Sequence, residues 1–139
     1  MTPYTHTVRF ADTDAAGVAY FARLFDWCHA AYEEALQAAG VPLPEFFGGR
    51  SIAVPIVHAE ADYRAPLRVG DRLHIHLQPH PRSESSFEIC YRVEREGQLC
   101  AAILTVHCSI DPTTRQRSPL SPALLSWCER QGVCDLSEG

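Results

Sequence analysis

The sequence contains no lysine, so arginine supplies all the fixed positive charge along its 139 residues. The net charge is −5 with histidine neutral, which argues against nucleic-acid binding, because phosphate contacts call for a basic surface. Any anionic ligand must therefore be held by local groups. Guanidinium groups suit bidentate contacts with phosphate or carboxylate, although the absence of lysine also fits a general bias in genome composition.

Long apolar runs are also missing. No stretch approaches the roughly 20 apolar residues that a membrane-spanning helix needs, and the first residues, MTPYTHTVRFADTD, lack the basic and apolar regions of a secretion signal. We therefore expect a cytoplasmic protein without a membrane partner. The six cysteines form no CxxC pair and several lie in strand-like runs, so we expect reduced core thiols rather than disulfides or a metal site.

The chain length and a hydrophobic fraction of 46% fit one globular domain over residues 1–139. Weak alternation predicts a short strand at 4–10. Between 21 and 39, apolar residues recur at spacings of three and four, which predicts a helix of about five turns that ends at Gly40 and Pro42.

Strand-like runs separated by turn-forming residues follow this helix, and Ser121 is placed to cap a short C-terminal helix with Pro122 at its first position. Their short connections predict antiparallel neighbours that bury one face on the long helix, an α+β fold. The last run is apolar at nearly every position, so we expect a central strand covered on both faces. One helix cannot cover both, so we expect the second subunit of a homo-oligomer to cover the remainder, with the C-terminal segment as the alternative. The runs lie at about 52–65, 69–80, 85–95 and 98–111.

Two aspartates, Asp12 and Asp14, precede the long helix, whose first turn is free of charge. Unpaired N–H groups at a helix start carry partial positive charge, and Gly17 allows a close approach of backbone. This pattern suits a site that polarises a carbonyl group beside a carboxylate, which attacks the acyl carbon or deprotonates a water that does so. The alternative is that either aspartate only caps the helix.

Residues 10–21, FADTDAAGVAYF, resemble the D-x-D-x-x-G-x-x-Y signature of hotdog-fold acyl-CoA thioesterases of the 4-hydroxybenzoyl-CoA thioesterase type. The resemblance implies a hotdog fold, an antiparallel sheet wrapped around one long helix, and hydrolysis of an acyl-CoA thioester without a metal or cofactor. It also implies a homo-oligomer, with a tetramer built as a dimer of dimers. It extends over most of the chain, at residues 55–57, 65–67, 70–71, 86–87 and 110–113.

The same motif assigns roles position by position. It makes Asp14 the catalytic carboxylate, and it makes the backbone N–H of Phe21, with Tyr20 adjacent, the donor to the developing oxyanion. Asp12 matches a structural position. Hotdog dehydratase chemistry is disfavoured, because no matching catalytic histidine motif is present.

A narrower resemblance concerns His29 in CHAAYE and His58 in VHA. Both strings are similar to the 1,4-dihydroxy-2-naphthoyl-CoA thioesterases of phylloquinone biosynthesis, which implies a bicyclic aroyl-CoA substrate bound by these histidines and Gly17. The alternatives are histidines satisfied within the sheet or a subunit interface, another aromatic or short-chain acyl-CoA, or a noncatalytic protein that only binds an acyl ligand.

Coenzyme A carries phosphates, for which arginine is the natural partner. Arg64 at a strand end and Arg82 in a loop are the candidates, together with Arg115 and Arg117. Alternating histidines at 74, 76 and 80 lack a carboxylate or cysteine to complete a metal site, so we expect them on a surface face of a strand.

Overall fold

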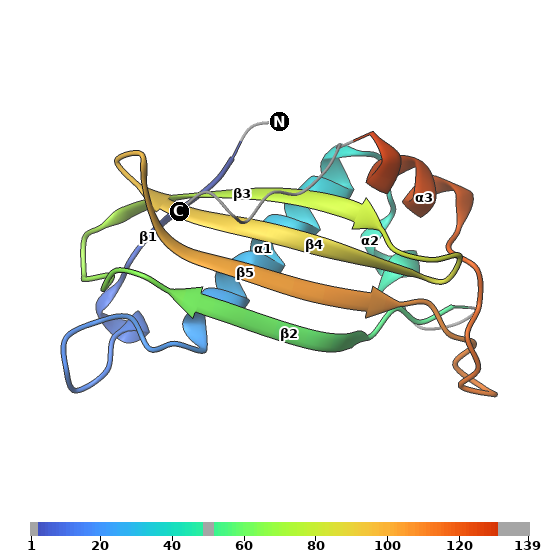
Figure 1. The fold of residues 1–139 in the computed structure, drawn as a ribbon, viewed down its shortest axis with the longest axis horizontal. Coiled ribbons are helices and arrows are strands. Elements are labelled where there is room, and N and C mark those ends of the chain that lie inside the picture. The colour runs from blue at the N-terminus through green and yellow to red at the C-terminus, as the bar shows by residue number, and fades with distance from the viewer. Residues whose placement is uncertain (1–2, 49–51, 131–139) are drawn as a thin grey trace.

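The computed structural model describes residues 3–48 and 52–130. One five-stranded antiparallel sheet has the order β1-β3-β4-β5-β2, and one long helix, α1, crosses one of its faces (Figure 1). The elements are β1 (Tyr4–Thr7), η1 (Phe10–Asp12), α1 (Arg23–Ala38), α2 (Leu43–Phe46), β2 (Ile56–Tyr63), β3 (Arg72–Pro81), β4 (Ser86–Arg95), β5 (Gln98–Cys108) and α3 (Pro122–Glu129). This is the hotdog arrangement that the resemblance implies.

The order of strands differs from the expected one in the place of β2. Consecutive strands β3, β4 and β5 are antiparallel neighbours as predicted, but β2 pairs with β5 at the far side of the sheet instead of with β3. The first strand, β1, occupies the edge beside β3. The central strand is therefore β4, while β5 is buried along nearly its whole length, as its composition predicts.

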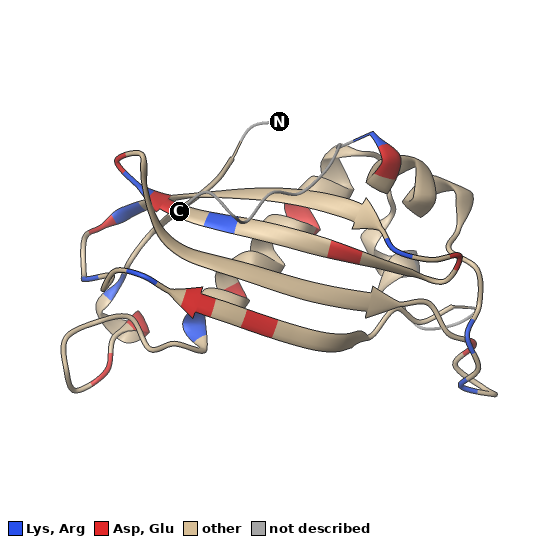
Figure 2. Cartoon of the chain, viewed as in Figure 1, with Lys and Arg blue, Asp and Glu red and all other residues tan. Residues whose placement is uncertain are grey.

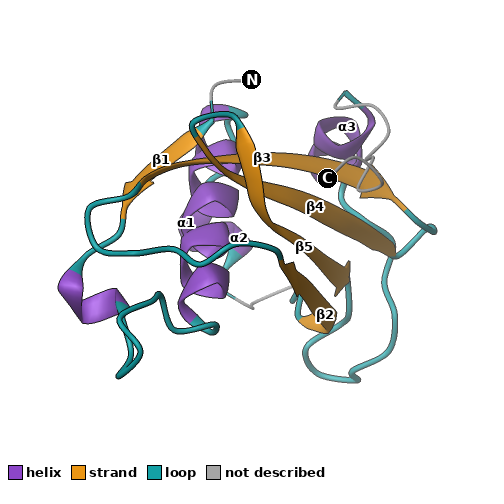
Figure 3. Ribbon diagram, turned by 60° about the vertical axis from the view of Figure 1, so that its left-hand side comes forward, coloured by secondary structure: helices purple, strands orange, loops and turns teal. Residues whose placement is uncertain are grey.

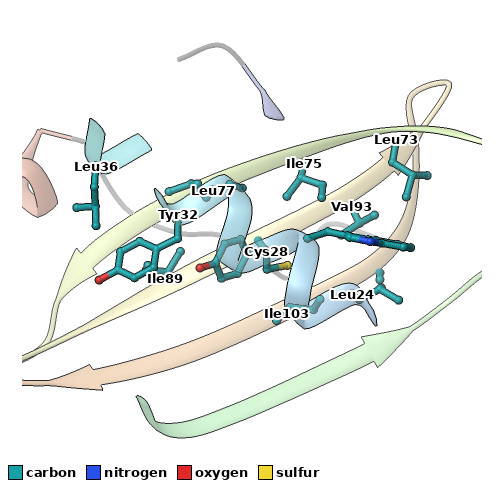
Figure 4. Close-up of a cluster of buried hydrophobic side chains, with 14 of the residues drawn as sticks. Leu24, Cys28, Tyr32, Leu36, Leu73, Ile75, Leu77, Ile89, Val93 and Ile103 are labelled. Atoms are coloured by element: carbon teal, nitrogen blue, oxygen red, sulfur yellow. The ribbon is translucent and has the colours of Figure 1, made fainter. Parts of the chain in front are cut away.

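The core lies between α1 and the face of the sheet that it crosses (Figure 3). A stripe of α1 residues spaced by four, Leu24, Cys28, Tyr32 and Leu36, is at most 5% exposed and points at the sheet (Figure 4). The facing β4 residues, Phe87, Ile89, Tyr91 and Val93, are fully buried. This spacing is what the apolar periodicity predicts for a helix packed on a sheet.

The predicted ends of the elements need adjustment near the N-terminus. The first strand ends at Thr7, because the chain turns into η1, and α1 begins at Arg23 rather than at Phe21. With 16 residues, α1 has about four and a half turns. The C-terminal helix is confirmed: the Ser121 hydroxyl accepts a hydrogen bond from the Leu124 N–H at 3.2 Å.

The cysteines are mostly as expected. Cys28, Cys100, Cys108 and Cys128 are free and buried. Cys90 is disulfide-bonded, so the prediction of reduced thiols is wrong for it. Cys134 lies outside the described residues.

The face of the sheet opposite α1 carries the alternating histidines, as expected. His76 lies on this face, and its Nε2 is 3.8 Å from Glu94 Oε1. Within residues 3–48 and 52–130, no three His, Cys, Asp or Glu side chains come together in a way that could hold a metal ion. No helix in the same ranges is long and apolar enough to cross a membrane.

Candidate active site

The segment between η1 and α1, residues 12–22, forms a closed loop that we call the helix-entry loop. Its ends are joined by a hydrogen bond from the Tyr20 N–H to the Asp12 carbonyl at 2.8 Å, and a second bond runs from the Asp14 N–H to the Val18 carbonyl at 2.9 Å. Gly17 has a φ of +80°, the left-handed conformation that favours glycine. A Cβ at Gly17 would meet no atom within 4 Å, so glycine serves the turn here and not a close approach.

Asp14 lies at the surface of the helix-entry loop. Its Oδ1 accepts a hydrogen bond from the Ala16 N–H at 2.8 Å, which fixes the side chain in a local turn. The residue at the N-cap position of α1 is Ala22, and no side chain caps the helix. The interpretation of Asp14 as a cap of the long helix is therefore wrong.

Asp12 has a different environment. Its carboxylate is 2% exposed, lies 3.0 Å from His6 Nε2 and accepts a hydrogen bond from the Arg9 N–H at 2.9 Å. Burial raises the pKa of Asp12, but these hydrogen bonds and the positive charge of His6 and Arg9 outweigh burial and hold the pKa below its usual value. Asp12 thus ties the loop to η1 and β1, the structural role that the motif implies.

A cavity of about 410 Å³ opens beside the helix-entry loop, within the size range of small-molecule sites. Asp14 and Phe21 contribute to it from one side, and the segment that follows β2 contributes from the other. Most of the lining residues are apolar, and Asp14 and Arg64 are the charged residues among them. The lining residues are Asp14, Val18, Ala19, Phe21, Leu24, Tyr63, Arg64, Ala65, Pro66, Leu67 and Cys100.

The start of α1 provides the second chemical element. In the described part of the chain no backbone carbonyl accepts from the N–H of Phe21 or of Ala22, whereas the Tyr20 N–H is taken up by Asp12. Phe21 therefore keeps the free amide that the motif predicts, and the prediction that Tyr20 supplies a second donor is wrong. Free N–H groups at a helix start attract negative charge.

One residue of the site was missed by the sequence analysis. The Tyr63 hydroxyl, at the end of β2, donates to the Phe21 carbonyl at 3.0 Å, and the two rings meet edge to face with centroids 6.5 Å apart. Burial, with the Cys28 thiol nearby, raises the pKa of Tyr63 above its usual value. The two residues are 42 positions apart, so no local pattern links them.

The predicted histidines lie elsewhere. His58 is on β2 opposite Val106, on the face of the sheet away from α1, and its Nε2 is 3.5 Å from Glu60 Oε1. His29 is exposed on α1 and, like Gly17, is not among the residues that line the cavity. None of these three residues lines the cavity beside Asp14 within one chain, and their contact with substrate stays a prediction.

The predicted arginines lie at opposite ends of the sheet. Arg64 lines the cavity, and its Nε donates to Asp62 Oδ2 at 2.9 Å. Arg82 follows β3, whose ten residues place it about 30 Å along the strand from the cavity end. Its Nε lies 3.7 Å from Glu88 Oε1. Within one chain, Arg82 does not reach the Asp14 cavity.

A second cavity, of about 320 Å³, lies at the same end of the sheet as Arg82. It is apolar apart from Arg115. Arg117 is close by in sequence, and its Nη1 is 3.5 Å from Ser85 Oγ. The lining residues are Phe46, Phe47, Ala53, Val54, Pro55, Ile110, Pro112 and Arg115.

The geometry of the first cavity suits reactions at a carbonyl carbon. A helix-start N–H can stabilise negative charge that develops on a carbonyl oxygen, and a nearby carboxylate can act as nucleophile or general base. Both groups belong to the same short loop, so their relative position is set locally.

Comparison with known proteins agrees with this chemistry. Residues 8–128 match the family model of the thioesterase-like superfamily. A 1,4-dihydroxy-2-naphthoyl-CoA hydrolase from Rippkaea orientalis is 47% identical over 130 residues, which cover 91% of this chain and 94% of the relative. A protein of the same name from Crocosphaera subtropica is 48% identical over 127 residues, 89% of this chain and 93% of the relative.

Solved structures agree as well. The crystal structure of a 1,4-dihydroxy-2-naphthoyl-CoA thioesterase from Synechocystis superposes with a TM-score of 0.87 at 33% identity, covering 99% of this chain and 98% of that one. The match to the family model includes Asp14 and Phe21 in the helix-entry loop and the four strands β2 to β5. This chain therefore belongs to the thioesterase-like superfamily and has its hotdog fold.

Proposed function

We propose that this protein hydrolyses 1,4-dihydroxy-2-naphthoyl-CoA to the free acid and coenzyme A. The main support is that Asp14 and the residue with a free helix-start amide, Phe21, line one cavity. Relatives at 47% and 48% identity carry the name of this hydrolase. The apolar walls of the cavity, which include the rings of Phe21 and Tyr63, suit an aromatic acyl group.

In the proposed reaction the thioester carbonyl oxygen lies at the Phe21 N–H, which stabilises the oxyanion that forms when the carbonyl carbon is attacked. Asp14 either attacks the carbon, giving an anhydride that water hydrolyses, or removes a proton from an attacking water. In both routes the C–S bond breaks, and the thiolate of coenzyme A leaves and takes up a proton. In the general-base route the oxygen of water enters the acid, whereas in the anhydride route water attacks either carbonyl carbon and its oxygen ends in the acid or in the Asp14 carboxylate. We propose that these groups suffice without a metal or cofactor, so a chelator should leave the rate unchanged.

We further propose that the active form is a homo-oligomer built on pairs of β2 strands. This strand is at the edge of the sheet and is exposed at nearly every position, with Val57 60% and Tyr63 45% exposed. A two-fold axis at Ala59 would place His58 of each strand opposite Glu60 of the other, whereas an axis at Glu60 would oppose two carboxylates. The acidic residues of β2 are visible in Figure 2.

Such a pair would also complete the substrate site. Antiparallel pairing sets the Tyr63 end of one β2 beside the Ile56 end of the other. The first cavity of one subunit would then lie beside the second cavity of its partner. The arginines near that cavity, Arg115, Arg117 and Arg82, would then approach the first cavity from the partner subunit, where they could bind the phosphates of coenzyme A. Arg64 would contribute from the same chain. A tetramer would join two such pairs.

A cytoplasmic location is part of the same proposal. Four described cysteines are free and buried, which fits a reducing compartment, although Cys90 is disulfide-bonded.

The decisive experiment is the release of thiol from a panel of CoA esters by the wild type and by Asp14→Asn. The panel contains the 1,4-dihydroxy-2-naphthoyl, 4-hydroxybenzoyl, benzoyl, short aliphatic and long aliphatic esters. The proposal requires the naphthoyl ester to have the highest kcat/KM and the variant to lose about a hundredfold or more in kcat. Preference for another ester would keep the reaction and change the substrate, whereas binding without turnover would indicate a protein that only binds acyl ligands.

A single turnover in water labelled with heavy oxygen tests for attack by Asp14 itself. Label found in the carboxyl group of Asp14 would establish attack by Asp14 itself.

A further inference from the structure

The Phe21 carbonyl belongs to the same residue as the proposed oxyanion donor, the Phe21 N–H. In a trans peptide group the C=O and the N–H point in opposite directions. The Tyr20 carbonyl accepts a hydrogen bond from the Arg23 N–H at 2.9 Å, which orients the peptide group that carries the Phe21 N–H. The next peptide group, between Phe21 and Ala22, is held on its carbonyl side by the Tyr63 hydroxyl at 3.0 Å.

Two consecutive peptide groups are therefore anchored through their carbonyl oxygens, while their N–H groups have no described backbone acceptor. Anchoring the carbonyl oxygen of a peptide group fixes the direction of its N–H. The first anchor comes from α1 itself. The second comes from β2, because Tyr63 is the last residue of that strand, and Tyr63 lines the cavity together with Phe21.

The Tyr63 hydroxyl has a second effect, which is electrostatic. A carbonyl oxygen near the reacting centre would repel the negative charge that develops on a thioester oxygen. A hydrogen bond to that carbonyl reduces its negative field and polarises the attached Ala22 N–H. The hydroxyl is suited to this task because it stays protonated around neutral pH, in line with its raised pKa.

We infer that Tyr63 is a positioning residue of the proposed thioester hydrolysis, whose hydroxyl holds and screens the Phe21 carbonyl so that the start of α1 presents its free amides to the oxyanion. The inference rests on the proposed function and adds a residue that the motif does not contain. It also connects the edge strand β2 with the helix-entry loop.

The test is Tyr63→Phe, which removes one oxygen atom and keeps the ring that lines the cavity. Because a hydrogen bond between neutral groups contributes modestly, we expect kcat to fall about 3- to 10-fold, with KM changed by less than about twofold, since the donor acts in the transition state. The matched control is Tyr4→Phe, which removes a phenol hydroxyl on β1 away from the cavity and should leave both constants unchanged. Replacement of Tyr63 by p-aminophenylalanine, which restores a donor at the same place, should recover kcat.

A second measurement does not depend on activity. In an amide NMR spectrum of the full chain, Tyr63→Phe should shift the Ala22 N–H to higher field, because the Phe21–Ala22 peptide group loses its polarising partner, and Tyr4→Phe should not. An unchanged kcat, a rise in KM alone, or an unchanged Ala22 resonance would each overturn the inference. If the wild type hydrolysed no CoA ester, the proposed function would fail, and the Ala22 resonance would still decide whether Tyr63 holds this peptide group.

Discussion

The imidazole ring of His6 lies against the indole ring of Trp27, with centroids 4.3 Å apart and planes tilted by 31°. The same imidazole reaches Asp12 Oδ2 at 3.0 Å. His6 thus connects β1 with η1, through Asp12, and with α1, through Trp27. Asp12 and Asp14 lie two residues apart in one motif but have different environments. Asp12 is buried and paired with His6, whereas Asp14 lines the cavity.

Asp12→Asn should therefore act mainly on stability. The asparagine keeps an oxygen for the Arg9 N–H but loses its charge beside His6, so we expect the free energy of unfolding at pH 7 to fall by about 1–2 kcal/mol. Because folding lowers the pKa of Asp12, its contribution is present above the unfolded pKa and is lost as the pH falls through the folded pKa. Urea unfolding between pH 7 and pH 3 should show the wild type and Asp12→Asn converging below about pH 4.

Asp14→Asn is the matched control, because Asp14 is exposed and its pairing is local. This variant should unfold like the wild type at every pH. A large loss of stability in Asp14→Asn, with none in Asp12→Asn, would contradict the division of roles.

Much of the fold follows from periodicity. The α1 stripe from Leu24 to Leu36 and the alternation along β3 each indicate one buried face, and the nearly continuous apolar run of β5 indicates burial on both faces. These elements and β4 lie where the sequence predicts them. The position of β2 was not predictable in this way. The composition of this strand indicates that it is exposed, but it does not indicate which strand lies next to it. The connection after Tyr63, residues 64–71, crosses the end of the sheet to the start of β3.

The same distinction, between features set by local sequence and features set by the folded chain, applies to the site. Asp14 and Phe21 are within one local motif, so a resemblance over residues 10–21 finds both. The status of Tyr20 depends on whether its N–H has an acceptor, and that acceptor, the Asp12 carbonyl, is known only once the loop has closed. The face of β2 that His58 occupies depends on the bulge between Ile56 and His58, which no sequence pattern reveals.

His107 should make the protein sensitive to mild acid. It is 1% exposed, its Nε2 is bonded to Thr105 Oγ1 at 2.8 Å, and its ring is stacked on Phe87. Burial, and to a lesser degree the charge of His29, lower the pKa of His107 to about 4. The unfolded chain binds a proton near the ordinary histidine pKa of about 6.5, whereas the folded chain does not. Stability is therefore expected to fall as the pH drops from about 6.5 towards 4.

The measurement is the free energy of unfolding across that pH range for the wild type and His107→Phe. The variant should lose the part of the slope that His107 contributes, even if it is less stable overall, because the Thr105 hydroxyl loses its partner. An unchanged slope in His107→Phe would mean that other groups cause the acid sensitivity.

The proposed pairing of β2 makes a prediction about charge. His58→Glu should place two glutamates opposite the two copies of Glu60, and like charges directly across a strand pair are destabilising. The variant should dissociate at concentrations where the wild type remains associated, as measured by sedimentation velocity. The double variant His58→Glu/Glu60→Arg restores opposite charges and should reassociate. Dissociation of both variants alike would refute the register with its axis at Ala59.

Mixing two impaired variants tests whether one active site uses both subunits. Asp14→Asn removes the catalytic carboxylate, and Arg115→Gln removes the arginine of the second cavity, which should raise KM for CoA esters while leaving kcat nearly unchanged. If the partner's Arg115 serves the cavity of Asp14, a heterodimer of the two variants contains one intact site, formed by Asp14 of one chain and Arg115 of the other. At substrate concentrations far below KM, the mixture should then be more active than either variant alone, after subunit exchange and not before. If Arg115 acts within its own chain, every site in the heterodimer remains damaged and mixing should recover nothing, which would overturn the composite site while leaving hydrolysis by Asp14 intact.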